Sequence, residues 1–423
     1  MRRYTEEPDI LISRWPRSSA VKHELVEYVR PIVSDVAQRG DKAVKTYTER
    51  FDNVKLDRFK VSRDEVQTAY QVVPQNQVAA LRESRRRLEI VESKRLTQSI
   101  FRVDIDGTEI KCTMRPIQSA GCYVPGGKAA YPSSVIMNVT PAKVAGVEKI
   151  IVCTPPCAGG EVNPLVLVAC DICMVDEIYK IGGAQAIAAM AYGTESVPRV
   201  EKIVGPGNKY VTAAKNLVSD VASIDKPAGP SEILIIADET SDPNLVAVDL
   251  ISQAEHGPGG VSGLVTTSEK MAEDVAQLID EKLSTLMRRE IVDMVLDENG
   301  FIYLVSTMEE AIDFTNRFAP EHLEIMTGVP EEVAEKITGS GLILLGDYSP
   351  VSSTDYCMGV NHVLPTGGYA RVASGITVLD YVKPVSVVKA TKTGLGSVKE
   401  SVGTLADAEG LPNHRLAVEA RFK

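Results

Sequence analysis

The sequence predicts an α/β fold with two doubly wound, incomplete Rossmann-like domains, an N-terminal helical arm and a small C-terminal tail domain. The chain has 423 residues. A single hydrophobic core stops growing at about 250–300 residues, so more than one domain is expected. Short β-rich runs alternate with helical segments, as in parallel sheets, and this alternation occurs twice. The runs fall at 149–153, 177–181, 201–204 and 233–237, and again at 261–267, 301–305 and 342–345.

Helix and turn signals divide the chain further. Helical spacing covers 18–50 and 63–98, and a hairpin follows, with extended runs at 100–105 and 108–114 around the turn Asp106-Gly107. We expect an arm over 1–17 and a discontinuous first domain made of 18–118 and 232–375. A second domain is expected over 119–231, and a tail with its own helix over 376–423.

Bulk composition excludes several classes of partner. The 46 basic and 57 acidic residues give a formal net charge of -11, which argues against nucleic acid and anionic membranes as partners. No stretch reaches the ~20 apolar residues that span a bilayer, and the N-terminus lacks a signal-peptide pattern. The seven cysteines are odd in number and lie mostly in apolar stretches, as reduced thiols do. These features predict a soluble, cytoplasmic protein.

Glycine-rich turns follow strands of the second domain, at 123–127, 181–185 and 204–208. Glycine lets the backbone approach a ligand closely, and the helix that follows offers free N–H groups to an anion. None of the turns is the G-x-G-x-x-G fingerprint, so each alone is compatible with a plain turn. Three in one domain favour a nucleotide-like ligand, which the amides of Gln185 and Asn208 could contact.

Candidate metal ligands gather at the end of a predicted helix over 243–256. Gln253 and His256 are three residues apart, so they share one face at the helix C-terminus, where the helix dipole favours a cation. An amide oxygen and an imidazole are possible zinc ligands, and Asp355 could add a carboxylate. The alternatives are a histidine that only interacts with the helix dipole, and an aspartate that serves a turn.

Glu321 and His322 form a candidate acid–base pair. They follow Pro320, which disfavours helix in the residue before it, so they are expected to begin a new segment. An adjacent carboxylate and imidazole can take successive proton-transfer roles if both face one cleft. Two unrelated surface residues are the alternative.

These motifs, in this order, resemble the histidinol dehydrogenase family, and the resemblance runs through nearly the whole chain. The matching segments are 121–127, 182–188, 205–210, 227–232, 252–258, 319–324, 355–366 and 409–414. The resemblance implies an NAD- and zinc-dependent, four-electron oxidation of L-histidinol to L-histidine through bound L-histidinaldehyde, in the last steps of histidine biosynthesis. It also implies a homodimer whose active sites are shared between subunits, with one zinc per subunit.

By the same resemblance, individual residues take roles. His322 is the base for the alcohol, and Glu321 activates water for the aldehyde. The implied zinc ligands are Gln253, His256, Asp355 and, from the partner subunit, His414. The implied substrate-binding residues are Ser231, Gln253, His256, His322, Asp355, Glu409 and His414. The implied NAD contacts are Tyr123, Gln185 and Asn208, in the second domain, while the first domain holds metal and catalytic residues and the tail dimerises.

Other readings stay open. A related zinc and NAD dehydrogenase could act on another amino alcohol or a polyol. A zinc hydrolase could use Glu321 to activate metal-bound water, and a non-catalytic nucleotide-binding module would leave the zinc ligands idle. A thiohemiacetal on Cys112 or Cys153 is a mechanistic variant, although neither has a flanking base in the sequence. For His362 we expect a structural or supporting role next to the metal ligands.

Overall fold

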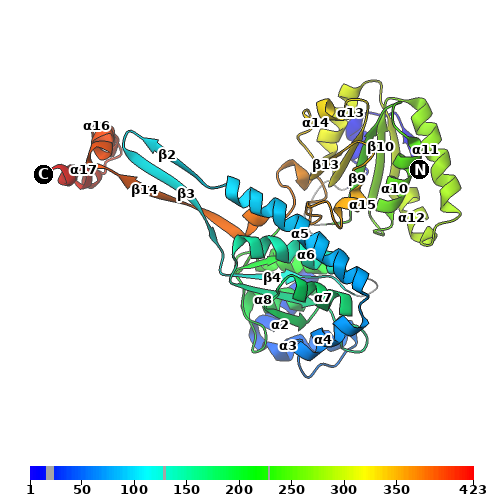
Figure 1. Ribbon diagram of the computed structural model, residues 1–423, viewed down its shortest axis with the longest axis horizontal. Helices are drawn as coiled ribbons and strands as arrows, with labels where there is room; N and C mark the ends of the chain where they lie inside the picture. Colours follow the sequence, from blue (N-terminus) through cyan, green and yellow to red (C-terminus); the bar gives the residue numbers. More distant parts are fainter. Residues whose placement is uncertain (16–22, 127–129, 227–228) are drawn as a thin grey trace.

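The computed structural model describes residues 1–15, 23–126, 130–226 and 229–423. Two α/β domains, each built on a parallel sheet, lie next to one another, and a long arm extends away from them (Figure 1). The α/β class and the two doubly wound sheets are as the sequence predicts. Residues 16 and 17 of the predicted arm, Gly127 of the first glycine turn, and Pro227 and Ala228 lie outside the described residues.

The first domain is built on a six-stranded sheet of order β1-β11-β10-β9-β12-β13, in which all pairs are parallel. From β9 the chain runs outward through β10 and β11, and it then returns to β12 and β13 on the other side of β9. The strands are β1 (Arg2–Tyr4), β9 (Glu232–Ala237), β10 (Val261–Thr266), β11 (Gly300–Leu304), β12 (His322–Met326) and β13 (Leu342–Leu345). The helices are α1 (Pro8–Ile12), α10 (Pro243–Ala254), α11 (Glu269–Leu283), α12 (Arg289–Asn299), α13 (Met308–Phe318), α14 (Pro330–Ala334) and α15 (Val351–Thr354).

The second domain is built on a five-stranded parallel sheet of order β6-β5-β4-β7-β8. Its strands are β4 (Ser119–Tyr123), β5 (Lys149–Thr154), β6 (Glu177–Lys180), β7 (Lys202–Val204) and β8 (Ser223–Ile224). Helices α6 (Pro132–Ala145), α7 (Pro164–Ile172), α8 (Gly183–Tyr192) and α9 (Lys209–Val218) alternate with them. Apolar side chains cover both faces of the central strands, as a parallel sheet between helical layers requires.

The arm combines two segments that are far apart in the sequence. The predicted hairpin forms β2 (Phe101–Ile105) and β3 (Thr108–Pro116), and β14 (Val382–Ala390) pairs antiparallel with β3 along its whole length. Helices α16 (Lys392–Ala408) and α17 (Pro412–Glu419) and the 3-10 helix η3 (Ala420–Phe422) end the chain at the tip (Figure 1). The tail therefore includes residues near 101–116 as well as the C-terminal segment.

The N-terminal helices pack on a different domain from the one predicted for them. Four helices, expected in the first domain, pack on helices of the second domain: α2 on α8 and α9, α3 on α8, α4 on α7, and α5 on α6. They are α2 (His23–Arg39), α3 (Asp41–Asp52), α4 (Arg63–Val72) and α5 (Gln75–Gln98). Their apolar faces complete the two cores around the five-stranded sheet, and periodicity alone does not say which sheet such a face covers.

Two smaller boundaries also differ. The N-terminal residues are no free arm, because β1 pairs with β11, and Leu11 and Trp15 are buried in the core of the first domain. Residues 376–381, expected in the tail, include the 3-10 helix η2 (Val378–Tyr381), which packs on α5 and α6. Another short 3-10 helix is η1 (Tyr369–Arg371). Within the described chain, no helix is long and apolar enough to cross a bilayer.

Candidate active site

The candidate catalytic residues lie at the amino-terminal edge of the six-stranded sheet. Neighbouring strands β9 and β12 begin at Glu232 and His322, with His322 aligned to Ile233. Helix α10 connects the parallel strands β9 and β10, so it runs back along the sheet and ends near the start of β10. Its last turn therefore brings Gln253 and His256 to the same edge. Ligands in open α/β sheets ordinarily bind at the carboxyl edge, so sheet topology alone would have pointed to the opposite side.

The predicted metal ligands are partly assembled. The imidazole Nε2 of His256 lies 3.7 Å from Oδ2 of Asp355. Gln253 is buried, and its side-chain nitrogen has no hydrogen-bond partner among the described residues. Burial raises the pKa of Asp355, but the interaction with His256 and the nearby His362 and His322 outweigh burial and leave that pKa below its ordinary value.

The chemical types of the candidate donors suit a zinc ion, since they are an amide, an imidazole and a carboxylate. In the part of the chain that the structure describes, no three His, Cys, Asp or Glu side chains lie close enough together to hold a metal ion. His256 and Asp355 are two such donors and the Gln253 amide is a third of another type, so a four-coordinate zinc ion would need one further donor.

His322 is buried with one ring nitrogen paired and the other bare. Its Nδ1 lies 3.0 Å from the backbone carbonyl oxygen of Glu232. A carbonyl can only accept, so Nδ1 carries the proton, and Nε2 keeps its lone pair. That Nε2 is buried without a partner in the described chain. Burial lowers the pKa of His322 to about 4, so the ring is neutral near pH 7.

Glu321 is held by a reciprocal pairing with Glu232, a residue that we did not predict as part of the site. The Glu232 backbone N–H donates to Oε2 of Glu321 (2.8 Å), and the Glu321 N–H donates to Oε2 of Glu232 (3.3 Å). Burial raises the pKa of Glu321 well above its usual range, and the charges of Glu232 and Asp355 raise it further. A carboxylate with a raised pKa is a stronger base, as activation of water requires.

Two further residues position Asp355. Nδ1 of His362 lies 2.8 Å from the Asp355 backbone oxygen, which agrees with the supporting role expected for this histidine. Oε1 of Glu324 accepts the backbone N–H of Val351 (2.7 Å), so strand β12 anchors the short helix α15 that precedes Asp355. The following segment reaches the second domain, where the Asn361 amide donates to the backbone oxygen of Met137 in α6 (2.7 Å).

The predicted cofactor residues lie at the carboxyl edge of the five-stranded sheet. Tyr123 ends β4, and its hydroxyl accepts the backbone N–H of Gly183 at the start of α8 (3.0 Å). Gln185 is buried in the first turn of α8, and neither polar atom of its amide has a partner among the described residues. Asn208 caps α9, with its side-chain oxygen accepting the backbone N–H groups of Tyr210 and Val211.

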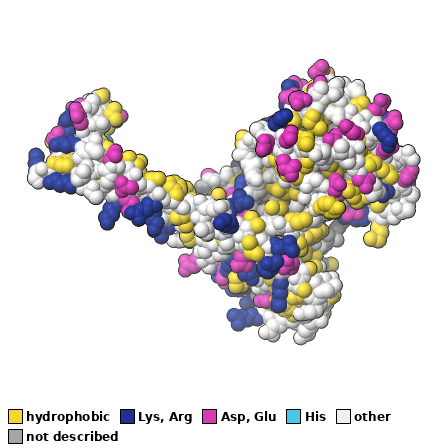
Figure 2. Space-filling model, turned by 45° about the horizontal axis from the view of Figure 1, so that its top comes forward, with side chains coloured by type: hydrophobic (Ala, Val, Ile, Leu, Met, Phe, Trp, Pro, Cys, Tyr) yellow, Lys and Arg dark blue, Asp and Glu magenta, His cyan; other side chains and the backbone are white. Residues whose placement is uncertain are grey.

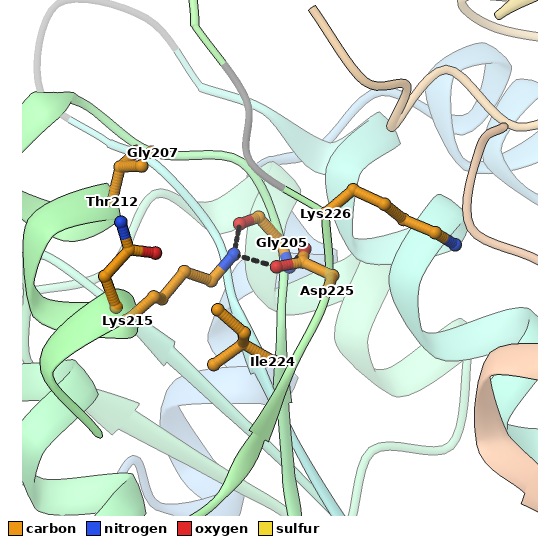
Figure 3. Close-up of a pocket in the computed structure, with 8 residues that line it drawn as sticks. Gly205, Gly207, Thr212, Lys215, Ile224, Asp225 and Lys226 are labelled. Carbon is orange, nitrogen blue, oxygen red and sulfur yellow. Dashed lines mark hydrogen bonds and ion pairs between the residues drawn. The ribbon is translucent and has the colours of Figure 1, made fainter. Parts of the chain in front are cut away.

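Gly205, in the third turn, requires glycine for two reasons. Its φ is +115°, and a Cβ there would lie 2.1 Å from the backbone oxygen of Tyr123. Figure 3 shows this turn beside a small pocket that Gly207, Lys215 and Asp225 also line. The carboxyl edge thus brings a buried amide with unpaired polar atoms, a helix N-terminus and a close-packed glycine turn together.

The remaining predicted residues divide between the two ends of the molecule. Ser231 immediately precedes β9, at the same edge as Glu232. Glu409 follows α16 and His414 lies in α17, both exposed at the tip of the arm, away from the first domain of the same chain (Figure 1). Of the two cysteines considered as nucleophiles, Cys112 lies in β3 of the arm, and burial raises the pKa of the Cys153 thiol, which keeps it protonated.

A comparison with models of protein families finds one that spans nearly the whole chain. The model of the histidinol dehydrogenase family matches residues 15–422. The chain belongs to the histidinol dehydrogenase family. Family members are NAD-dependent oxidoreductases that oxidise L-histidinol to L-histidine in histidine biosynthesis, and this chain is such an oxidoreductase, acting on a small molecule.

Individual relatives span nearly the whole chain or all of it. The histidinol dehydrogenase of Methanosarcina mazei is 46% identical over 395 residues, which cover 93% of this chain and 91% of that protein. That of Methanocaldococcus jannaschii is 45% identical over 419 residues, which cover 99% and 96%. The crystal structure of histidinol dehydrogenase from Elizabethkingia anophelis superposes with a TM-score of 0.95 at 36% identity, and covers 100% of this chain and 98% of that one.

Proposed function

We propose that the amino-edge site of the first domain carries out both oxidations of L-histidinol, with one zinc ion per subunit and NAD⁺ at the glycine turns of the second domain. The observation that carries this proposal is the bare, buried Nε2 of His322, whose ring lies near His256 and Asp355. A neutral imidazole near candidate metal ligands is suited to take a proton from a bound alcohol.

In the alcohol step, Nε2 of His322 takes the hydroxyl proton of histidinol while the carbon gives a hydride to NAD⁺. The products are the aldehyde, NADH and a protonated His322. The Glu232 carbonyl stays hydrogen-bonded to Nδ1 throughout, so it keeps the ring in the tautomer that can accept at Nε2 and stabilises the imidazolium that forms.

In the aldehyde step, Glu321 takes a proton from the water molecule that adds to the aldehyde carbonyl. The hydrated carbon then gives a second hydride to a second NAD⁺, and the carboxylic acid that results releases its proton to solvent, which leaves the carboxylate of histidine. The raised pKa of Glu321 supports this role, because a stronger base shares the proton of water more readily. Two residues with separate environments can thus serve the two oxidations in turn.

Zinc, when bound, would hold the imidazole and amino nitrogens of the substrate and so orient its reacting carbon. The residues of this chain that would hold it are Gln253, His256 and Asp355. Ser231 lies at the same edge and is proposed to bind the substrate. Tyr123, Gln185 and Asn208 are proposed to bind NAD⁺, and the unpaired polar atoms of Gln185 support this, because a buried amide without partners is costly unless a ligand satisfies it.

The arm is proposed to join two copies of the chain. Figure 2 shows hydrophobic side chains along it, and strand β2 exposes Phe101, Val103 and Ile105 at alternate positions. Exposed apolar faces of this kind are typical of protein–protein interfaces. In such a dimer the partner subunit's Glu409 and His414 would complete substrate and zinc binding, since the tip of the arm lies away from its own site (Figure 1).

The test is turnover of L-histidinol with NAD⁺, before and after treatment with a chelator. The proposal predicts close to two NADH per histidinol, histidine as the product, and loss of activity that added zinc restores. One NADH per histidinol would contradict the second step at this site. Oxidation of other amino alcohols or polyols with equal kcat/KM would favour a different substrate, and hydrolysis without NAD⁺ would favour the hydrolase alternative. The cytoplasmic location stays a prediction.

A further inference from the structure

A buried ion pair lies beneath the third glycine turn of the second domain. Lys215 in α9 and Asp225 after β8 are paired, and both side chains are almost fully buried. Removing charges from water is costly, so such a pair rarely adds much net stability. Its position next to Gly205 therefore suggests a different use.

The ion pair holds both backbone polar groups of Gly205. The Gly205 N–H donates to Oδ2 of Asp225 (2.7 Å), and the Lys215 ammonium donates to the Gly205 carbonyl oxygen (2.7 Å). Figure 3 shows Lys215 reaching across the pocket to both Gly205 and Asp225. Because one residue supplies a donor and the other an acceptor, the pair fixes the peptide planes on both sides of a residue whose φ is +115°.

This turn is close to the proposed cofactor residues on either side. Gly205 lies directly against the Tyr123 carbonyl, and Asn208, which caps α9, follows three residues later. A shift of the Gly205 backbone would therefore move both the end of β4 and the N-terminus of α9. Phosphate binding at such a turn depends on backbone N–H groups that are already oriented before the ligand arrives.

We infer that Lys215 and Asp225 are positioning residues for the dinucleotide, which hold the Gly205 turn in its binding conformation without touching the substrate. This inference rests on the proposed cofactor site and adds two residues to it. The pair acts through Gly205, so its removal should weaken the binding of NADH and NAD⁺ and leave the binding of histidinol unchanged.

The experiment compares the wild type with Asp225→Asn and with the double variant Lys215→Met/Asp225→Leu. The double variant removes both charges at similar volume, so no unpaired charge is left in the core. We expect the Kd for NADH, measured by fluorescence titration, to rise about tenfold in the double variant. KM for NAD⁺ should rise in parallel, whereas KM for histidinol stays unchanged. Without any ligand, hydrogen–deuterium exchange of residues 204–211 should become faster.

Glu177→Gln is the matched control. Glu177 begins β6 at the opposite edge of the same sheet and pairs with Lys60 (2.7 Å) and Lys149 (3.1 Å). This variant should leave the Kd for NADH unchanged, whatever its effect on Tm. An unchanged Kd in both ion-pair variants would overturn the inference, as would an equal rise in the KM for both substrates.

Failure of the proposed function gives a different result. A wild type that binds NADH but does not oxidise histidinol would contradict the proposed function, and the Kd comparison would still decide the role of the pair. A wild type that binds no NADH would overturn this inference together with the cofactor site.

Discussion

At the scale of single residues, backbone groups at the sheet edge set the chemical character of Glu321 and His322. The carbonyl of Glu232 fixes the tautomer of His322, and its N–H and carboxylate hold Glu321. The adjacent pair could be predicted from the sequence, because Pro320 begins a new segment. Glu232 could not, since it lies 89 residues from Glu321 and only the pairing of β9 with β12 brings them together.

Replacing His322 with glutamine should impair the alcohol step. Glutamine keeps a donor for the Glu232 carbonyl but provides no base, and loss of a general base costs roughly 10²–10⁴-fold in rate. We expect oxidation of histidinol to slow by about a thousandfold, with oxidation of supplied histidinaldehyde affected much less. Single-turnover NADH formation from each substrate measures the two steps separately.

Replacing Glu321 with glutamine should slow the aldehyde step more than the alcohol step. Glutamine can still accept the Glu232 N–H, so the local structure is retained, but it cannot take a proton from water. The aldehyde step should slow by about a hundredfold or more, and the first NADH should then form in a burst. If both variants slow both steps equally, the division of roles between these two residues is wrong.

At the scale of elements, the termini of helices and strands carry most of the site. Helix α10 could be predicted closely, because Asp242 accepts the Asn244 N–H as its cap and Pro243 occupies the first turn. The place of Gln253 at its end was therefore foreseeable. Strand β12 was not predicted as a strand, because its five residues, His322–Met326, include Glu324, which is buried against α15.

Helix α3 ends in Asp52, whose negative charge is expected to lower the stability of the folded chain. Burial raises the pKa of Asp52, the last residue of α3, to about 6, and its Oδ2 has no partner among the described residues. The negative end of the helix dipole disfavours this carboxylate as well. A raised carboxyl pKa means that the folded state holds the proton more tightly, so stability is lost as pH rises from about 4 through 6.

Asp52→Asn should therefore raise the free energy of unfolding at pH 7 by about 1 kcal/mol, after allowance for the partial exposure of the side chain. At pH 4 the carboxyl is protonated in the folded chain, and the variant and the wild type should have nearly equal stability. Urea unfolding at both pH values checks this. Equal stabilisation at pH 4 and pH 7 would show that the ionisation of Asp52 is not the cause.

At the scale of the whole molecule, the two parallel sheets place their candidate functional residues at opposite edges. The first domain uses the amino edge for its candidate catalytic residues, and the second uses the carboxyl edge for its candidate cofactor residues. The sequence predicted both sheets, because strand and helix periodicities are local. It misassigned α2 to α5 and the hairpin β2–β3, because contacts between distant segments decide which sheet a helix covers and which strand a hairpin joins.

The position of the arm supports the proposal that each active site combines residues of two chains. His256 lies at the edge of the first domain, and His414 lies at the exposed tip of the arm of the same chain (Figure 1). A site that needs both must therefore take one from each subunit. In a two-fold symmetric dimer, the two arms would reach the two sites reciprocally.

Mixing two inactive variants tests this claim directly. His256→Ala and His414→Ala subunits, allowed to exchange, should form heterodimers with one intact site, and the mixture should regain about a quarter of the wild-type activity. His256→Ala mixed with Asp355→Ala serves as the control, because both changes lie in the same half of the site and no intact site can form. The predicted result is that activity returns in the mixture of His256→Ala with His414→Ala and does not return in the control mixture. Mass spectrometry would first show that the subunits have exchanged. If the first mixture then stays inactive, the shared site is contradicted.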